Sequence, residues 1–402
     1  MNITSKGFHT FTIVLRLTIK EAERLIRDFY NYIKQSDEIE FFPINANKGM
    51  EGSDEFSKWL YSSSSRYFVA RYTNQGKGIL WLLRCSNTSP GFIRPGEIDR
   101  PCSIKATINP QILLGKKDYL SASTSEYLND VEALFDAEAK KISSVLREYR
   151  HYLINRPDYC INFDLEELGI SCTSEQMIDL IKRGDIPHHY SERTEYSDTS
   201  KRRISNKDSF YLESKSVTVN CYRKHKQLKN EFSTCPNLEA SHNLIRFEVQ
   251  CKYLKTYALT KKIKNQLNIS SSDVIREMLS DDFCADIIRD YFNRTIRRGD
   301  YFTLDGAIQQ VRHRRFKKKK EDRLIGELQR INQFRGIHKV RAMLGIEELE
   351  VFRRTLNDLA DINVNPVTIP KNWGIPHIPN LLDAYDLKVD EERLKKNGRI
   401  VS

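Results

Sequence analysis

The spacing of apolar residues changes near residue 253, and this change constrains the fold more than any other feature of the sequence. Before it, apolar and polar residues alternate in short runs, which is the period of a half-buried strand. After it, apolar residues recur every three or four positions, which is the period of a helix. The sequence therefore predicts an α+β domain over residues 1–255 and a basic, mainly helical domain over residues 256–402.

The runs predicted as strands are rich in β-branched and aromatic residues and end at turn residues. They cover residues 8–17, 65–73, 78–84, 103–110, 157–164, 209–214, 216–222 and 244–251. Helices are predicted over residues 19–34, 124–149 and 174–184, and the last two have a polar residue at their start that would cap them. Strands that alternate in this way suit an antiparallel sheet with helices on one face. A turn over residues 74–78 would join two of the strands as a hairpin.

Charge and cysteine content narrow the class of protein. Lys and Arg outnumber Asp and Glu by 65 to 54, which gives a net charge of +11. Such a surplus favours a polyanionic partner, although a merely basic surface explains it as well. The eight cysteines show no zinc-binding spacing, which is typical of reduced cysteines in a cytosolic protein. No apolar run approaches the length of a membrane span, so we expect a cytoplasmic protein without a membrane partner.

Three predicted strands each carry polar residues on one face. Residues two apart on a strand point the same way, which groups Asp158 with Asp164, groups Arg246 with Glu248, and places Tyr222 at the end of a third strand. If these strands share a sheet, carboxylates and a tyrosine meet on its open face. Carboxylates bind Mg²⁺ or Mn²⁺, and a tyrosine hydroxyl beside such an ion can attack a phosphodiester. The alternatives stay open: a strand tyrosine also packs in cores, and an Arg–Glu pair also forms a plain salt bridge.

Four segments, in order along the chain, resemble filamentous-phage gene II proteins, which belong to a wider group of phage and plasmid replication initiators. The first is Ser103-Ile-Lys-Ala-Thr-Ile-Asn-Pro-Gln-Ile-Leu-Leu-Gly, and the second is Arg156-Pro-Asp-Tyr-Cys-Ile-Asn. The third, Val219-Asn-Cys-Tyr-Arg-Lys-His-Lys-Gln-Leu, is similar to the segment that carries the nicking tyrosine. The fourth is Leu244-Ile-Arg-Phe-Glu-Val-Gln-Cys-Lys-Tyr-Leu-Lys-Thr-Tyr. The resemblance spans roughly residues 8–260.

The resemblance implies a rolling-circle replication initiator that nicks one strand at a double-stranded origin. Tyr222 would become joined to the 5′ end, leave a 3′-OH primer for a host polymerase, and later allow the strand to be rejoined. Lys224 and His225 would assist it at the scissile phosphate. The family is related to the HUH endonucleases, which hold a metal with a His–hydrophobic–His strand on a ferredoxin-like sheet. This chain contains no His-x-His, so Mg²⁺ or Mn²⁺ would fall to carboxylates.

The predicted nicking reaction also requires residues that hold a metal ion and residues that contact DNA. The carboxylates expected to hold the metal are Asp158, Glu248 and Asp164. The basic residues expected to contact DNA are Arg246, Lys226, Arg312, Arg314, Arg315, Lys317 and Lys318. A solvated helix end or linker is the alternative explanation for the run after residue 311. Three short helices over residues 324–359 would suit a helix-turn-helix or any small bundle.

The expected partners are double- and single-stranded DNA at a replication origin, with a host helicase and polymerase, in the cytoplasm of a bacterial host. Two other functions stay open. A mobilisation relaxase would use the same chemistry at a transfer origin. A non-catalytic origin- or operator-binding protein would bind specific DNA without a metal-dependent nick.

Overall fold

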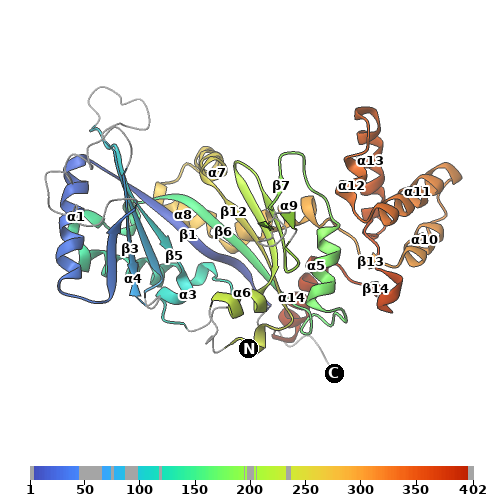
Figure 1. Ribbon diagram of the computed structural model, residues 1–402, viewed down its shortest axis with the longest axis horizontal. Helices are drawn as coiled ribbons and strands as arrows, with labels where there is room; N and C mark the ends of the chain where they lie inside the picture. Colours follow the sequence, from blue (N-terminus) through green and yellow to red (C-terminus); the bar gives the residue numbers. More distant parts are fainter. Residues whose placement is uncertain are drawn as a thin grey trace. The chain divides into compact units, whose positions relative to one another are not determined.

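The computed structural model describes residues 4–44, 66–73, 77–86, 98–116, 120–193, 195–196, 203–204, 206–231 and 237–396. The chain is α+β and divides into two compact units, each built from segments that are distant in sequence (Figure 1). Unit 1 comprises Met1–Lys6, Cys160–Val249 and Ala285–Ser402, and unit 2 comprises Gly7–Tyr159 and Gln250–Cys284.

Unit 2 is organised around a sheet. From β2 to β5, each strand pairs antiparallel with the strand that follows it in the chain. Its strands follow the order β2 (Ile39–Pro43), β3 (Arg66–Tyr72), β4 (Ile79–Cys85), β5 (Cys102–Ile108), β1 (Lys6–Leu17) and β6 (Leu153–Asp164). One set of alternate side chains, including Leu15, Trp81 and Ile104, is at most 4% exposed and forms the core. The other set carries the polar and charged residues, as the strand period requires.

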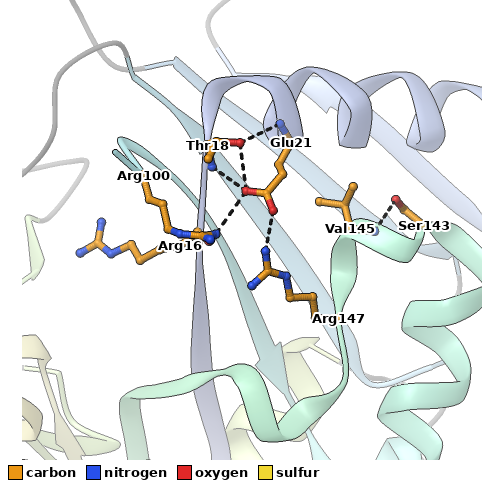
Figure 2. A network of polar contacts seen from close by, with 7 residues as sticks. All are labelled: Arg16, Thr18, Glu21, Arg100, Ser143, Val145 and Arg147. Atoms are coloured by element: carbon orange, nitrogen blue, oxygen red, sulfur yellow. Dashed lines mark hydrogen bonds and ion pairs between the residues drawn. The ribbon is translucent and has the colours of Figure 1, made fainter. Parts of the chain in front are cut away.

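The helices of unit 2 are α1 (Ile19–Ile33), α3 (Pro110–Leu113), α4 (Leu128–Ile142), α7 (Tyr253–Leu267) and α8 (Ser271–Met278). Helix α1 begins directly after β1 because Thr18 and Glu21 form a capping box, in which each side chain bonds the other residue's backbone N–H (Figure 2). Its buried face packs on the sheet through Leu25 and Phe29, and Phe29 stacks on Phe41 of β2.

Unit 1 contains a second run of strands, in the order β6, β12 (Leu244–Cys251), β11 (Val217–Arg223), β10 (Ser209–Glu213) and β7 (Ser191–Glu192). Strand β10 pairs antiparallel with both β11 and β7. The two-residue strands β8 (Glu195–Tyr196) and β9 (Arg203–Ile204) pair separately. Helix α5 (Ser174–Lys182), capped by Thr173 and Gln176, packs on β10 and β11. Helix α6 (Lys224–Glu231) follows β11 without a break.

The remaining helices complete unit 1, apart from the first residues of α9, which lie in unit 2. They are α9 (Asp281–Thr295), α10 (Leu304–His313), α11 (Lys318–Phe334), α12 (Ile337–Arg341), α13 (Ile346–Ala360) and α14 (Leu381–Lys396). Helices α10, α11 and α13 enclose a small apolar core that includes Val311, Leu328 and Leu359 (Figure 1). Arg335, in the left-handed conformation, ends α11.

The Pro-rich segment over residues 363–380 folds back onto the start of the helical region. Val364 bridges to Asp300, and the short strand β14 (His377–Ile378) pairs with β13 (Tyr301–Phe302). Gly299 adopts a positive φ of 92°, and a Cβ there would lie 2.6 Å from the Val364 carbonyl carbon. Only glycine permits this close approach of the two backbones.

A buried ion-pair cluster ties α5 to the helical region within unit 1. The Asp185 side chain is almost fully buried and contacts the guanidinium groups of Arg341 and, at 3.4 Å, Arg297. Burial raises the pKa of Asp185, and the two arginines act in the opposite direction. His338 adds a contact, since its Nδ1 lies 3.2 Å from the Gly184 carbonyl oxygen.

We expect Asp185→Ala to lower the free energy of unfolding by about 3 kcal/mol, because it leaves two partly buried arginines without their carboxylate. Urea unfolding followed by circular dichroism measures this. The exposed pair Arg353–Glu350 supplies a matched control, and Glu350→Ala should leave the free energy of unfolding close to that of the parent. Equal effects of the two substitutions would contradict the role given to Asp185.

Three sequence expectations differ from the structure. The units do not follow the predicted boundary at residue 255, because β12 and α9 carry the chain from one unit to the other. The helix predicted over 124–149 spans only Leu128–Ile142, since Ser143 is extended and its hydroxyl caps the next turn. Strand β6 begins at Leu153, so Pro157 lies inside it and not at its start. The predicted turn at 74–76 lies outside the described residues.

None of the helices in the described part of the chain is both long enough and apolar enough to cross a bilayer.

Candidate active site

Tyr222 occupies the last full pair of strand β11, opposite Ser209 of β10, immediately before the chain turns into α6. The alternation of β11 buries Val219 and Cys221 on the core side and sends Tyr222 to the polar face. Only 7% of Tyr222 is exposed. The tyrosine is thus held near the end of an inner strand, with its hydroxyl among the polar side chains of neighbouring strands.

The Tyr222 hydroxyl donates a hydrogen bond of 2.8 Å to Oε1 of Glu248 on β12. Glu248 Oε1 also lies 3.7 Å from Nη1 of Arg246, two residues earlier on the same strand face. The structure therefore brings together the predicted tyrosine and one of its three predicted carboxylates.

Burial and two neighbouring charged groups determine the protonation state of the Tyr222 hydroxyl. Burial and the Glu248 carboxylate raise the pKa of Tyr222 well above its usual value, while Arg246 acts in the opposite direction. The phenol is therefore protonated at neutral pH, and a carboxylate oxygen already accepts its hydrogen bond. Any reaction that uses Tyr222 as a nucleophile must move this proton, and Glu248 is the group positioned to receive it.

Arg246 does not lie where a DNA-contacting arginine would. Its side chain is fully buried, and its Nε donates a 2.7 Å hydrogen bond to Oδ1 of Asn162 on β6. The prediction that Arg246 contacts DNA is at odds with this placement. Its charge instead balances the buried Glu248, because an unpaired carboxylate at this depth would be costly.

A cavity of about 270 Å³ opens beside the Tyr222–Glu248 pair. All of its lining residues belong to unit 1, and all but Tyr222 are polar or charged. They are Asn206, Asp208, Ser209, Asn220, Tyr222, Arg223, Lys226, Gln227, Asn230 and Glu248. Lys226, on the exposed side of α6, is the one lysine in this lining. Arg223 is held by Asp208 and Glu175, with both distances at 2.7 Å.

Of the two other residues predicted to act in catalysis, Lys224 lies near the Tyr222 ring, whereas His225 faces elsewhere in the same unit. Lys224 is 2% exposed, donates to Gln227 Oε1 at 2.7 Å, and has its Nζ 5.9 Å from the centre of the Tyr222 ring. His225 turns toward the loop before β12, where its Nδ1 lies 3.0 Å from the Leu238 carbonyl oxygen. Lys224 is thus a neighbour of the tyrosine, and His225 anchors a loop.

The predicted metal ligands do not form one cluster. Asp158 belongs to unit 2, where its Oδ2 accepts hydrogen bonds from Thr10 at 2.5 Å and Arg156 at 2.9 Å. Asp164 Oδ1 accepts the backbone N–H groups of residues 166 and 167, both at 3.0 Å, and so forms a turn. Among the described residues no three His, Cys, Asp or Glu side chains gather as a metal site. A hard divalent ion takes several oxygen ligands. In the described part of the chain, the carboxylate that contacts the Tyr222 hydroxyl is that of Glu248.

The basic residues between the last turn of α10 and the first turn of α11 divide into two groups. Arg312, Arg314, Arg315 and Lys317 are exposed. Lys318, also predicted to contact DNA, pairs with Asp322 at 2.9 Å and Glu321 at 3.5 Å in the first turn of α11. The four residues of the first group are therefore better placed to contact a phosphate than Lys318, whose ammonium group already pairs with two carboxylates.

Sequence reasoning missed two groups of this site. Asn162 holds Arg246, although it was visible in the sequence as a polar residue on the same strand face as Asp164. Asn220 and Gln227 also line the cavity. Gln227 reaches it because the chain turns from β11 into α6 directly after Tyr222 and Arg223.

Comparisons with known proteins give a narrow result. No family model and no curated protein sequence matches the chain. Among solved structures, one described as a rolling circle replication initiator protein from Geobacillus stearothermophilus matches over 71% of this chain and 96% of its own. The two share 10% identity and a TM-score of 0.28. A similarity at this level carries no argument about function, so the proposal below rests on this chain's own residues.

Proposed function

We propose that the chain is a rolling-circle replication initiator that nicks one strand of a double-stranded origin through Tyr222. The observation that carries the proposal is the 2.8 Å hydrogen bond from the Tyr222 hydroxyl to Glu248 at a polar cavity. A buried tyrosine hydroxyl needs a hydrogen-bond partner in any case. A carboxylate partner beside a polar cavity adds a group that can take the proton of the hydroxyl as it attacks.

In the proposed reaction the Tyr222 oxygen attacks the phosphorus of the scissile phosphodiester. Its proton passes to Glu248, a bond forms between the tyrosine oxygen and phosphorus, and the bond from phosphorus to the 3′ oxygen breaks. The leaving oxygen takes a proton and becomes the 3′-OH primer. The 5′ phosphate stays on Tyr222 as an ester, and the reverse steps rejoin the strand. Buried Arg246 pairs with Glu248 at 3.7 Å, and exposed Lys226 faces the phosphate that enters the cavity.

The ferredoxin-like, HUH-related relationship and the requirement for Mg²⁺ or Mn²⁺ also remain proposals. A divalent ion, when bound, would stabilise charge on the phosphoryl oxygens. Because the described residues do not assemble a ligand cluster, no step above depends on one. Host helicase and polymerase are the partners that the 3′-OH product would need.

The test is to incubate the protein with supercoiled plasmid that carries its own replicon's DNA, with Mg²⁺, Mn²⁺ or EDTA. A denaturing gel then shows whether nicked DNA carries protein at its 5′ end. A 5′ adduct whose 3′-OH primes synthesis in a cell-free extract supports the proposal. A nick that fails to prime favours a mobilisation relaxase. Specific binding without any nick would overturn the enzymatic function.

The exposed basic group after α10 should supply electrostatic affinity for duplex DNA. We expect the triple substitution of Arg312, Arg314 and Arg315 to alanine to make the salt dependence shallower, lowering the magnitude of the slope of log K against log salt by up to about 3. Fluorescence anisotropy with a labelled duplex between 50 and 200 mM salt, roughly the range over which such contacts are most visible, measures the slope. Lys318→Ala is the control, because its ammonium is already paired within α11. A slope unchanged in the triple variant would contradict this role.

A further inference from the structure

Unit 2 contains a second cavity, of about 610 Å³, on the polar face of its sheet. The register of the strands places the residues that line the sheet side of this cavity. Arg16 of β1 and Arg84 of β4 both lie opposite Ser103 of β5. Lys105 of β5 lies opposite Val14 of β1. The alternate residues of the same strands, such as Leu15 and Ile104, point into the core. The period of the strands therefore collects the basic side chains on one side.

Helix α7 forms the wall of this cavity. Its lining residues Tyr253, Tyr257 and Lys261 are spaced four apart, and Lys264 continues the same face. Tyr253 is 55% exposed and Tyr257 is 60% exposed. Their ring centres lie 6.2 Å apart with the planes inclined by 30°, so two aromatic faces stand side by side at the edge of the cavity.

The charge of the cavity has one sign. Five cations line it, and no carboxylate does: Arg16, Arg84, Lys105, Lys261 and Lys264. Within the part of the chain that the structure describes, no ion pair joins any of the five to an acidic side chain. Burial lowers the pKa of Lys105, and the nearby charges of Arg16, Arg156 and Arg84 lower it further. An anion in the cavity would relieve this repulsion.

The end of β1 that carries Arg16 is fixed before any ligand arrives (Figure 2). Arg100 donates to the Arg16 carbonyl oxygen and to Glu21, both at 3.3 Å. Arg147 holds the other oxygen of Glu21 at 2.5 Å, and Glu21 caps α1 with Thr18. A site held in place by such a network loses less freedom on binding than a mobile one.

We propose that this cavity, the basic groove, binds single-stranded DNA, with the phosphates on the five cations and bases stacked on Tyr253 and Tyr257. Rows of cations beside exposed aromatic rings are the pattern of sites that follow a single strand. In a duplex the bases stack on one another and are not available to protein rings. The groove lies in the unit that does not contain Tyr222, and its occupancy does not depend on the nicking reaction proposed above.

The experiment measures binding of a labelled oligo-dT by fluorescence anisotropy, with EDTA present and in a Tyr222→Phe background so that the DNA is not cut. We expect Tyr253→Ala combined with Tyr257→Ala to weaken binding at least about tenfold. The phenylalanine pair at the same positions should bind like the parent, because stacking is kept. Lys105→Gln with Arg84→Gln should lower the salt slope by about 0.7 for each lost phosphate contact.

Leu254→Ala provides a matched control on the same helix, since Leu254 is 58% exposed but does not line the cavity. Thermal unfolding by circular dichroism confirms that each variant is folded. Unchanged oligo-dT affinity in the folded alanine pair would overturn the proposal. An equal loss on a duplex of the same sequence would overturn the assignment to a single strand, and a loss confined to oligo-dT supports it.

Discussion

Tyr222→Phe should form no covalent DNA–protein adduct, while its binding to origin DNA stays within about twofold of the parent. Phenylalanine keeps the ring that packs at the end of β11 and removes only the oxygen that would bond to phosphorus. The Glu248 carboxylate loses its donor but keeps Arg246 at 3.7 Å, so the fold should tolerate the change. Denaturing gels of end-labelled DNA measure the adduct, and anisotropy measures the binding.

Tyr211→Phe is the matched control for this prediction. Tyr211 lies on the same sheet face, opposite Asn220 on the neighbouring strand, with Arg193 5.3 Å from its ring, but it does not line the cavity. It should form the adduct at the parental rate. An adduct that survives in Tyr222→Phe and disappears in Tyr211→Phe would move the nucleophile to β10 and contradict the assignment.

Glu248→Gln should slow nicking by a factor of about 10²–10⁴. The amide preserves the shape of the side chain and can still accept a hydrogen bond from Tyr222, but it cannot take the proton. Single-turnover cleavage of an oligonucleotide that carries the nick site measures the rate. Glu175→Gln is a suitable control, because this carboxylate holds Arg223 at the rim of the site without contacting Tyr222.

The pH dependence of this variant distinguishes proton transfer from a structural role. Burial, the larger cause of the raised pKa of Tyr222, remains in Glu248→Gln, so the phenol is still mostly protonated at pH 8. Without the carboxylate, the reaction depends on the small ionised fraction, and the rate should rise about tenfold per pH unit below that pKa. A slow rate that does not change with pH would mean that Glu248 acts on structure alone.

Much of the secondary structure follows from local pattern. Strand β12 was predicted over 244–251 and has those bounds, because Ile245, Phe247 and Val249 alternate with polar residues without interruption. The caps at Thr18 and Thr173 place α1 and α5 within two residues of their predicted ends. These features depend on interactions between residues close in sequence, which a single sequence contains.

Local sequence pattern does not predict how deeply a side chain is buried, or which segments of the chain make up each unit. Periodicity places Arg246 on the polar face of β12, but it cannot tell that β6 and β11 flank this strand or that the Arg246 side chain is fully buried. For the same reason the two carboxylates Asp158 and Glu248, predicted as one metal site, belong to different units. The alternation of residues on each strand suggested that Tyr222 and a carboxylate could share one face of a sheet. Their pairing also requires β11 and β12 to be adjacent, and no local sequence pattern predicts this.

The unit that contains Tyr222 is assembled from an early, a middle and a late stretch of the chain. During synthesis, residues 160–249 leave the ribosome well before residues 285–396, whose packing completes the same unit. The Arg341 and Arg297 partners of Asp185 are among the late residues. A nascent or truncated chain therefore contains Tyr222 and Glu248 before the late helices that complete their unit have packed.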